Sequence, residues 1–176
     1  MLFRSRQSVR GLRDEVTSGD DLRVLLMHCG EQLAQDYAIP FTLSVLGEPP
    51  AIDPTVCREM YYIGREAISN AFQHSQAVKI EATISYGESV VTLTVRDNGV
   101  GIESDVLNRG RIGHWGFPGM RERAESIGAE FSVRSHVGSG TEVSLTVPVK
   151  LVKPVSRKES LWRRIWTFAK EPSVPS

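Results

Sequence analysis

The chain has few cysteines, and it lacks the long apolar segments that mark membrane-spanning and secreted proteins. Among its 176 residues are two cysteines, Cys29 and Cys57, whose spacing fits no metal-binding or redox motif. No apolar run approaches the ~20 residues that a transmembrane helix needs. Residues 1–13 lack the apolar stretch of a secretory signal peptide. We therefore expect a cytoplasmic protein whose cysteines are reduced core residues.

Two common nucleotide-binding motifs are also absent. The sequence contains no G-x-x-x-x-G-K-[ST] phosphate-binding loop. The dinucleotide motif G-x-G-x-x-G fails as well, because Gly99 and Gly101 are followed by Ser104 and no helix is expected to begin there. A nucleotide site in this chain would have to be of another kind.

The balanced charge hides an asymmetry along the chain. Residues 1–13 carry four arginines and no acid, and residues 150–176 carry seven basic and two acidic residues. Since the whole chain has 21 residues of each sign, residues 14–149 carry ten basic and nineteen acidic residues, a net charge of −9. An acidic body between basic tails argues against nucleic acid as a partner of the core.

The apolar pattern predicts one domain in which helices and strands alternate. We expect helices over 22–38, 54–74 and 117–128, and strands over 41–47, 78–86, 90–97, 129–136 and 141–149. Two connections are too short for a crossover and predict antiparallel hairpins. The fold class is therefore α+β: a two-layer sandwich in which a mixed, mostly antiparallel sheet is covered on one face by about three helices.

The second predicted helix carries a polar stripe. Glu66, Asn70 and His74 are spaced at i, i+4 and i+8, which places them on one helix face. The positions that we assign to the opposite side are apolar and suited to packing on a sheet: Ile63, Ala67 and Ala71. Spacing alone fits a solvated face as well as a binding site.

The strand over 90–97 ends in Asp97, at the mouth of a glycine-rich loop. A buried carboxylate there can accept a hydrogen bond from an amine such as that of adenine, and hydrogen bonds to charged groups contribute about 1.5–3 kcal/mol. Gly99 and Gly101 allow the backbone to come close to a ligand. By itself, D-x-G-x-G is also a common turn.

Glycines recur before the last helix and before the last strand. Gly113, Gly116 and Gly119 are spaced every three residues, and backbone amides at a glycine-rich helix N-terminus bind phosphate well. Thr141 follows a Gly-Ser-Gly turn and opens a strand. Its hydroxyl either serves a ligand or simply faces the sheet.

In this order, the four elements resemble the ATP-binding site shared by histidine kinases, DNA gyrase and the heat-shock chaperone ATPases, which has the Bergerat or GHKL fold. REAISNAFQHS is similar to the N box, DNGVGI and GHWGFPGM to the two glycine boxes, and GSGTEV to the closing threonine motif. The residues of these motifs are most similar to those of sensor histidine kinases of the nitrate-sensor group, whose ATP lid is short. The resemblance covers residues 20–148, and four motifs in register are far more specific than one.

The resemblance implies roles for the polar residues. Asn70 would coordinate Mg²⁺, and Glu66 would act near the γ-phosphate of ATP. Asp97 would bind the adenine amine, assisted by Thr141 directly or through water. His74 matches a position close to the phosphates and is assigned a weaker role.

The same resemblance assigns the remaining contacts to the glycine boxes. Gly99 and Gly101 would shape the floor of the pocket, and Gly116 and Gly119 would contact phosphates. Three further candidates for nucleotide contact are Ile102, Gly113 and Met120. Three lid residues keep a second interpretation as parts of a solvated or packed loop: Arg109, Arg111 and Trp115.

A phosphoacceptor histidine is not evident. The four histidines are His28, His74, His114 and His136, and none is followed by the acidic residue typical of that site. Residues 1–16 resemble the end of a dimerisation helix, so we expect 17–150 to be the ATP-binding domain of a larger membrane sensor. Its partners would be a dimerisation domain that carries the histidine and, indirectly, a response regulator.

Residues 151–176 form a basic tail with aromatic residues at helical spacing. Such a segment can lie on an anionic membrane or bind a partner, although packing on the domain or fraying at the terminus is the simpler interpretation. Three alternatives to a histidine kinase share the expected fold: a module that binds ATP only as a regulatory ligand, an anti-sigma-type protein kinase, and an interaction domain whose site has decayed.

Overall fold

The computed structural model describes residues 19–103, 116–148 and 150. The elements follow in the order α1 (Gly19–Tyr37), β1 (Phe41–Leu46), α2 (Pro54–His74), β2 (Ile80–Tyr86), β3 (Val90–Asp97), α4 (Phe117–Ser126), β4 (Glu130–Ser135) and β5 (Thr141–Pro148). This is the predicted order of helices and strands. No helix in these ranges is both long enough and apolar enough to cross a membrane.

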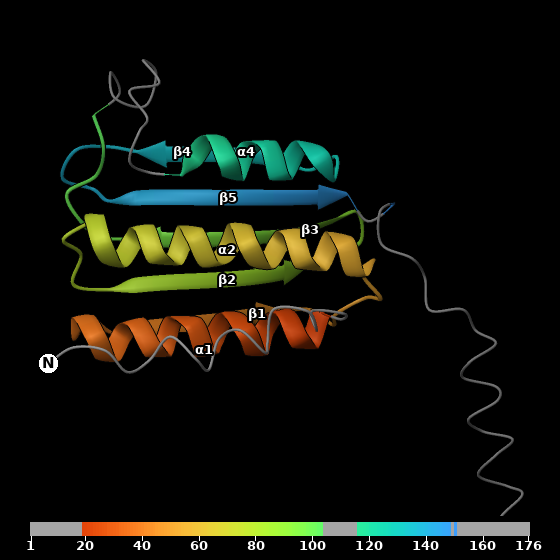
Figure 1. Ribbon diagram of the computed structural model, residues 1–176, viewed down its shortest axis with the longest axis horizontal. Coiled ribbons are helices and arrows are strands. Elements are labelled where there is room, and N and C mark those ends of the chain that lie inside the picture. The colour runs from red at the N-terminus through yellow and green to blue at the C-terminus, as the bar shows by residue number, and fades with distance from the viewer. Residues whose placement is uncertain (1–18, 104–115, 149, 151–176) are drawn as a thin grey trace, which may run out of the picture.

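The five described strands form one open sheet in the order β1-β2-β3-β5-β4. β1 pairs with β2 in parallel, and the other three pairs are antiparallel. Helices α1, α2 and α4 form a single layer over one face, with α1 over β1, α2 over the centre and α4 over β4 (Figure 1). The predicted two-layer α+β sandwich with a mixed sheet is confirmed.

Local signals fix where α2 begins and ends. The side chain of Asp53 accepts a hydrogen bond from the backbone N–H of Thr55 at 2.9 Å, and Pro54 occupies the first turn. At the other end, the hydroxyl of Ser75 donates to the carbonyl of Ala71, and the N–H of Ala77 donates to that hydroxyl. The last two turns of α2 lie near the C-terminal end of β3 and the N-terminal end of β5, where the cavity described below lies.

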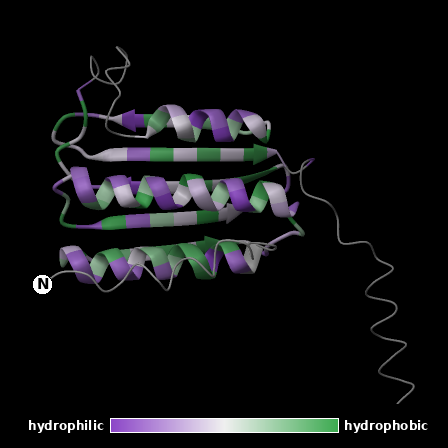
Figure 2. Ribbon diagram, viewed as in Figure 1, coloured by the Kyte–Doolittle hydropathy of each residue, from purple (hydrophilic) through white to green (hydrophobic). Residues whose placement is uncertain are grey.

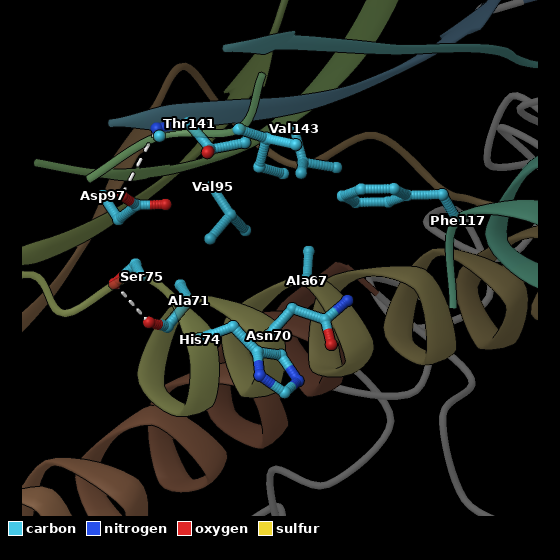
Figure 3. A pocket seen from close by; sticks show the side chains of 12 residues that line it. Ala67, Asn70, Ala71, His74, Ser75, Val95, Asp97, Phe117, Thr141 and Val143 are labelled. Carbon is cyan, nitrogen blue, oxygen red and sulfur yellow. Dashed lines mark hydrogen bonds between the residues drawn. The ribbon is translucent and has the colours of Figure 1, made fainter. Parts of the chain in front are cut away.

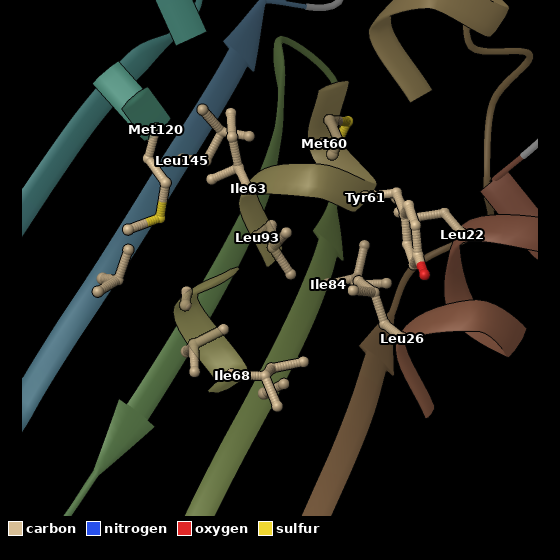
Figure 4. Close-up of a cluster of buried hydrophobic side chains, with 14 of the residues drawn as sticks. Leu22, Leu26, Met60, Tyr61, Ile63, Ile68, Ile84, Leu93, Met120 and Leu145 are labelled. Atoms are coloured by element: carbon tan, nitrogen blue, oxygen red, sulfur yellow. The ribbon is translucent and has the colours of Figure 1, made fainter. Parts of the chain in front are cut away.

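The two faces of the sheet differ as a period of two requires. The inner face packs large apolar side chains against the helices, and Ile63 and Ile68 of α2 meet Ile84 and Leu93 of the sheet (Figure 4). On the open face, one row of hydroxyl side chains crosses all five strands: Ser44, Thr83, Thr94, Ser144 and Ser132. Hydrophobic and hydrophilic residues accordingly alternate along both helices and strands (Figure 2). The sheet therefore holds its core on one side only.

Replacing Ile68 by alanine tests this core. The side chain has 0% of its surface exposed, so Ile68→Ala is expected to lower the free energy of unfolding by about 2–5 kcal/mol. Val24→Ala is the matched control, since Val24 is 53% exposed and its loss should change the stability by less than about 0.5 kcal/mol. Urea denaturation measures both, and equal effects would contradict this assignment of the core.

Candidate functional site

A cavity lies between the last turns of α2, the C-terminal end of β3 and the N-terminal end of β5 (Figure 3). It holds about 390 Å³ of space, part of it open to solvent. Its apolar walls come from Ala67, Ala71, Val95, Ile102, Phe117 and Val143. Its remaining walls come from Asn70, His74, Ser75, Asp97, Gly101 and Thr141. A concave, mostly apolar slot with a few polar groups is the usual form of a small-molecule site.

Asp97 is the buried carboxylate of this cavity. β3 ends at Asp97 and leaves 5% of the residue exposed. One carboxylate oxygen, Oδ1, accepts hydrogen bonds from the backbone N–H of Gly99 at 2.9 Å and of Thr141 at 3.3 Å. The other oxygen points into the cavity (Figure 3). The carboxylate is thus anchored through one atom and offers the second to a ligand.

Burial raises the pKa of Asp97, and the two backbone N–H groups oppose that shift without cancelling it. Ionisation of Asp97 is therefore less favourable than that of an exposed aspartate. A ligand with an N–H group at this position would favour the ionised form. The site is thus suited to a ligand that donates a hydrogen bond to Asp97 from within an apolar slot.

α2 contributes two of the predicted polar residues and two residues that we misplaced. Asn70 and His74 line the cavity one turn apart, as predicted. Ala67 and Ala71 also line it, which corrects their assignment to the opposite side of the helix. Adjacent residues of a helix are rotated by only about 100° about its axis, so Ala67 and Ala71 lie beside Asn70 and His74 rather than opposite them. The small alanines leave room there, while Asn70 and His74 supply the polar rim.

Glu66 lies outside the cavity lining, one turn before Asn70. Its carboxylate is beside Gly116, where a Cβ atom would lie 2.6 Å from Oε1 of Glu66. Gly116 has φ +64, immediately before α4. Glu66 therefore lies beside the residue that precedes α4.

α4 begins at Phe117, whose side chain contributes to the cavity wall. This helix is held on α2 by Arg123, which binds Glu59 at 2.8 Å and lies over the ring of Tyr62 at 5.0 Å. Arg123 is about half exposed, and such exposed pairs contribute about 0–1 kcal/mol. Burial of Met120 and Ala124 in the core holds the helix more strongly than this pair does.

The glycines of the site make room mainly for the protein's own backbone. A Cβ atom at Gly99 would lie 2.0 Å from the carbonyl oxygen of Ser75, and one at Gly101 would lie 2.1 Å from that of His136. One at Gly140 would lie 2.0 Å from the carbonyl oxygen of Asp97. We expected Gly99 and Gly101 to admit a ligand. Instead they let the loop after β3 pack against α2 and against the β4–β5 turn, although Gly101 also lines the cavity.

The remaining predicted contacts fall into two groups. Gly119 has no atom within 4 Å of the position of a Cβ and is exposed, and Met120 is 2% exposed. Met120 is thus a core residue outside the cavity wall, and its contact with a nucleotide stays a prediction. Four predicted lid residues lie outside the described residues: Arg109, Arg111, Gly113 and Trp115.

Besides Ala67 and Ala71, sequence reasoning missed four residues of the cavity wall: Ser75, Val95, Phe117 and Val143. For two of them a signal was present. Val95 shares the face of β3 with Asp97, and Val143 shares the face of β5 with Thr141, because side chains alternate along a strand. Once Asp97 and Thr141 were chosen, strand parity would have placed both valines in the same cavity.

Comparison with known proteins agrees with this geometry. Residues 56–151 match the family of histidine kinase-, DNA gyrase B- and HSP90-like ATPases. The chain belongs to this family. The match covers α2, the glycine-rich loop, α4 and both strands of the last hairpin, and it confirms the resemblance seen in the four motifs.

Relatives within the family include several sensor kinases. The chain is 34% identical over 130 residues to the nitrate/nitrite sensor protein NarX of Escherichia coli, covering 73% of this chain and 21% of that protein. It is 35% identical over 99 residues to the sensor histidine kinase LiaS of Bacillus subtilis, covering 56% of this chain and 27% of that protein. The chain thus spans about a fifth to a quarter of the length of these relatives.

A solved structure supports the fold of this ATPase domain. The blue-light activated histidine kinase of Erythrobacter litoralis superposes with a TM-score of 0.60 at 21% identity, covering 72% of this chain and 41% of that one. At this level of identity the superposition shows a common fold and carries no information about residues of the site.

The contact between Gly99 and Ser75 can be tested by adding a methyl group. Gly99→Ala forces the loop away from a backbone carbonyl and is expected to lower the free energy of unfolding by about 1–3 kcal/mol. Gly119→Ala is the matched control, because Gly119 is also a glycine of these motifs and a Cβ atom there would meet no other atom within 4 Å. Gly119 lies in α4. Chemical denaturation compares the two variants, and a Gly99→Ala protein as stable as the parent would contradict the tight contact.

Proposed function

We propose that this ATPase-family chain binds Mg-ATP in the cavity and acts as the catalytic domain of a two-component sensor histidine kinase. The observation that carries the proposal is the carboxylate of Asp97, which is buried at the end of an apolar slot with one oxygen turned into it. Sensor kinases among the relatives support the choice of reaction. The γ-phosphate would be donated to a histidine carried by a partner domain.

The adenine ring would lie at the end of the cavity that Asp97 and Thr141 line. Val95 and Val143 on the sheet face Ala67 and Ala71 on the helix, and together they form walls suited to a flat apolar ring (Figure 3). The free oxygen of Asp97 would accept a hydrogen bond from the ring's amine. This pairing supplies the N–H donor that a buried carboxylate requires.

The phosphates would extend along the polar rim of α2. The described residues contain no group of three or more His, Cys, Asp and Glu side chains able to hold a metal ion by themselves. The amide oxygen of Asn70, which lines the cavity, would be the ligand from the protein, and phosphate oxygens and water would complete the coordination of Mg²⁺. When bound, the metal ion neutralises phosphate charge.

In phosphoryl transfer, the residues of this chain would mainly position the reacting groups. Asn70 and His74 would orient the phosphates along the helix. Glu66, one turn before Asn70, would polarise the attacking group near the γ-phosphate. Phosphoryl transfer depends mainly on such positioning and on charge stabilisation. We propose a cytoplasmic location, and as partners a histidine-bearing dimerisation domain and, through it, a response regulator.

Asn70→Ala is expected to abolish Mg²⁺-dependent transfer from ATP. Loss of the metal ligand should reduce transfer at least about 100-fold. The measurement is transfer of labelled γ-phosphate from ATP to a supplied dimerisation-domain protein of a related sensor kinase. Ser69→Ala is the matched control, because Ser69 adjoins Asn70 on α2 and its hydroxyl accepts from Gln73 on the exposed side. Tight ATP binding by the parent chain without any transfer would favour a regulatory ATP-binding module instead.

Asp97→Asn is expected to weaken ATP binding about tenfold or more while leaving the fold intact. Asparagine presents either an N–H group or a weaker acceptor to the adenine amine. Burial raises the pKa of Asp97, so ATP affinity of the parent should fall with decreasing pH sooner than for an ordinary aspartate, as the carboxylate becomes protonated.

The variant should lack this pH dependence. Since the raised pKa means that ionisation of Asp97 opposes folding as the pH rises, the variant should also be no less stable than the parent at neutral pH. Titration calorimetry across pH measures the affinity. An equal pH dependence in parent and variant would show that Asp97 does not contact the nucleotide.

A further inference from the structure

Three backbone segments of the site meet at one buried hydroxyl that the proposed function does not use. Ser135, the last residue of β4, is 8% exposed and lies outside the cavity wall. Its oxygen accepts from the backbone N–H of Ile102 at 2.7 Å and donates to the carbonyl of Gly140 at 2.9 Å. It also lies 2.9 Å from the hydroxyl oxygen of Thr141.

The hydrogen atoms of this cluster can be assigned by counting donors. A serine hydroxyl has one hydrogen, and a carbonyl oxygen can only accept. If Ser135 donates to Gly140, the contact between the two hydroxyls needs the hydrogen of Thr141. All three bonds therefore form together in one arrangement, in which Thr141 donates to Ser135. The oxygen of Thr141 then has only lone pairs left for the cavity.

The assignment of the Thr141 hydrogen has a consequence for the end of the cavity that Asp97 and Thr141 line. Asp97 offers a carboxylate oxygen there, and Thr141 offers an oxygen whose hydrogen is already used. Both groups accept and neither donates. A ligand with an amino group at this position is bound, whereas a ligand with a carbonyl oxygen in the same place meets two acceptors and no donor.

We propose that Ser135 is a specificity-determining positioning residue: it holds Thr141 as an acceptor and so makes the site select adenine over purines that carry a 6-oxo group. The inference rests on the proposed binding of ATP in this cavity. Ser135 acts through Thr141, and through Ile102, whose N–H it binds and whose side chain lines the same cavity. Without Ser135, the hydroxyl of Thr141 is free to rotate and to donate to an oxo group.

The test compares the dissociation constants of ATP and inosine triphosphate, whose bases differ in the group at the 6-position and in the hydrogen that the 6-oxo base carries on N1. In Ser135→Ala, the preference of the chain for ATP over inosine triphosphate is expected to fall about five- to tenfold, the worth of one hydrogen bond. Ser132→Ala is the matched control: Ser132 lies on the same strand, pairs with Ser144 on the open face, and should leave the preference unchanged.

A double-variant experiment separates positioning from general loosening of the site. In a Thr141→Val background, Ser135→Ala should no longer change the preference, since the hydroxyl that Ser135 orients is gone. A preference that falls equally in both backgrounds would overturn the proposal. Ser135→Cys, which is close in size to serine and a weaker hydrogen-bonding group, should give an intermediate value and tests the idea if the alanine variant does not fold.

The outcomes distinguish this inference from the proposed function. If the parent chain binds neither nucleotide, the assignment of the cavity to ATP fails. If the parent prefers ATP and every folded variant of Ser135 keeps the parent's preference, ATP binding stands and the role of Ser135 is overturned.

Discussion

Burial of one carboxylate is the constraint on which the rest of the site depends. Asp97 lies at the end of a central strand with almost no exposed surface, and an isolated ionised group in such a place is unfavourable. Two backbone N–H groups reduce that cost by binding one oxygen, and they come from Gly99 and Thr141, which follow β3 and begin β5. The loop after β3 and the first residue of β5 are therefore fixed by the same side chain.

Close packing of backbone around this carboxylate explains the glycines. Gly140 lies against the carbonyl of Asp97 with φ +81, and Gly99 lies against the carbonyl of Ser75 at the end of α2. The N–H of Val100 also donates to Ser75, and the N–H of Gly138 donates to the carbonyl of Val100. Three elements far apart in sequence are thus joined without side chains between them, which leaves the cavity itself to be lined by α2, β3 and β5.

The buried hydroxyls extend this network from position to chemistry. Ser75 caps α2, and Ser135 ties Ile102 to the β4–β5 turn. Together they satisfy backbone groups that would otherwise be buried without partners. In the role that we propose for Ser135, its hydrogen bond to Gly140 leaves Thr141 as the donor between the two hydroxyls.

Much of this protein followed from the sequence because its signals are local. The periods of two and 3.6 residues, Asp53-Pro54 before α2, and the two short connections gave every described helix and strand, the hairpins and the covered face of the sheet. The motif residues Asn70, His74, Asp97 and Thr141 were likewise predicted, and the cavity contains all four.

Only the tertiary structure decided which residues meet across elements. The parallel pairing of β1 with β2, the position of Ala67 and Ala71 at the cavity, the burial of Met120 and the convergence at Ser135 all depend on contacts between distant segments. A single sequence carries no local period or cap for such contacts, because they are set by how helices and strands pack and by which backbone groups remain to be hydrogen-bonded. Residue types and spacing determined which polar groups the site contains, and packing determined which of them line the cavity.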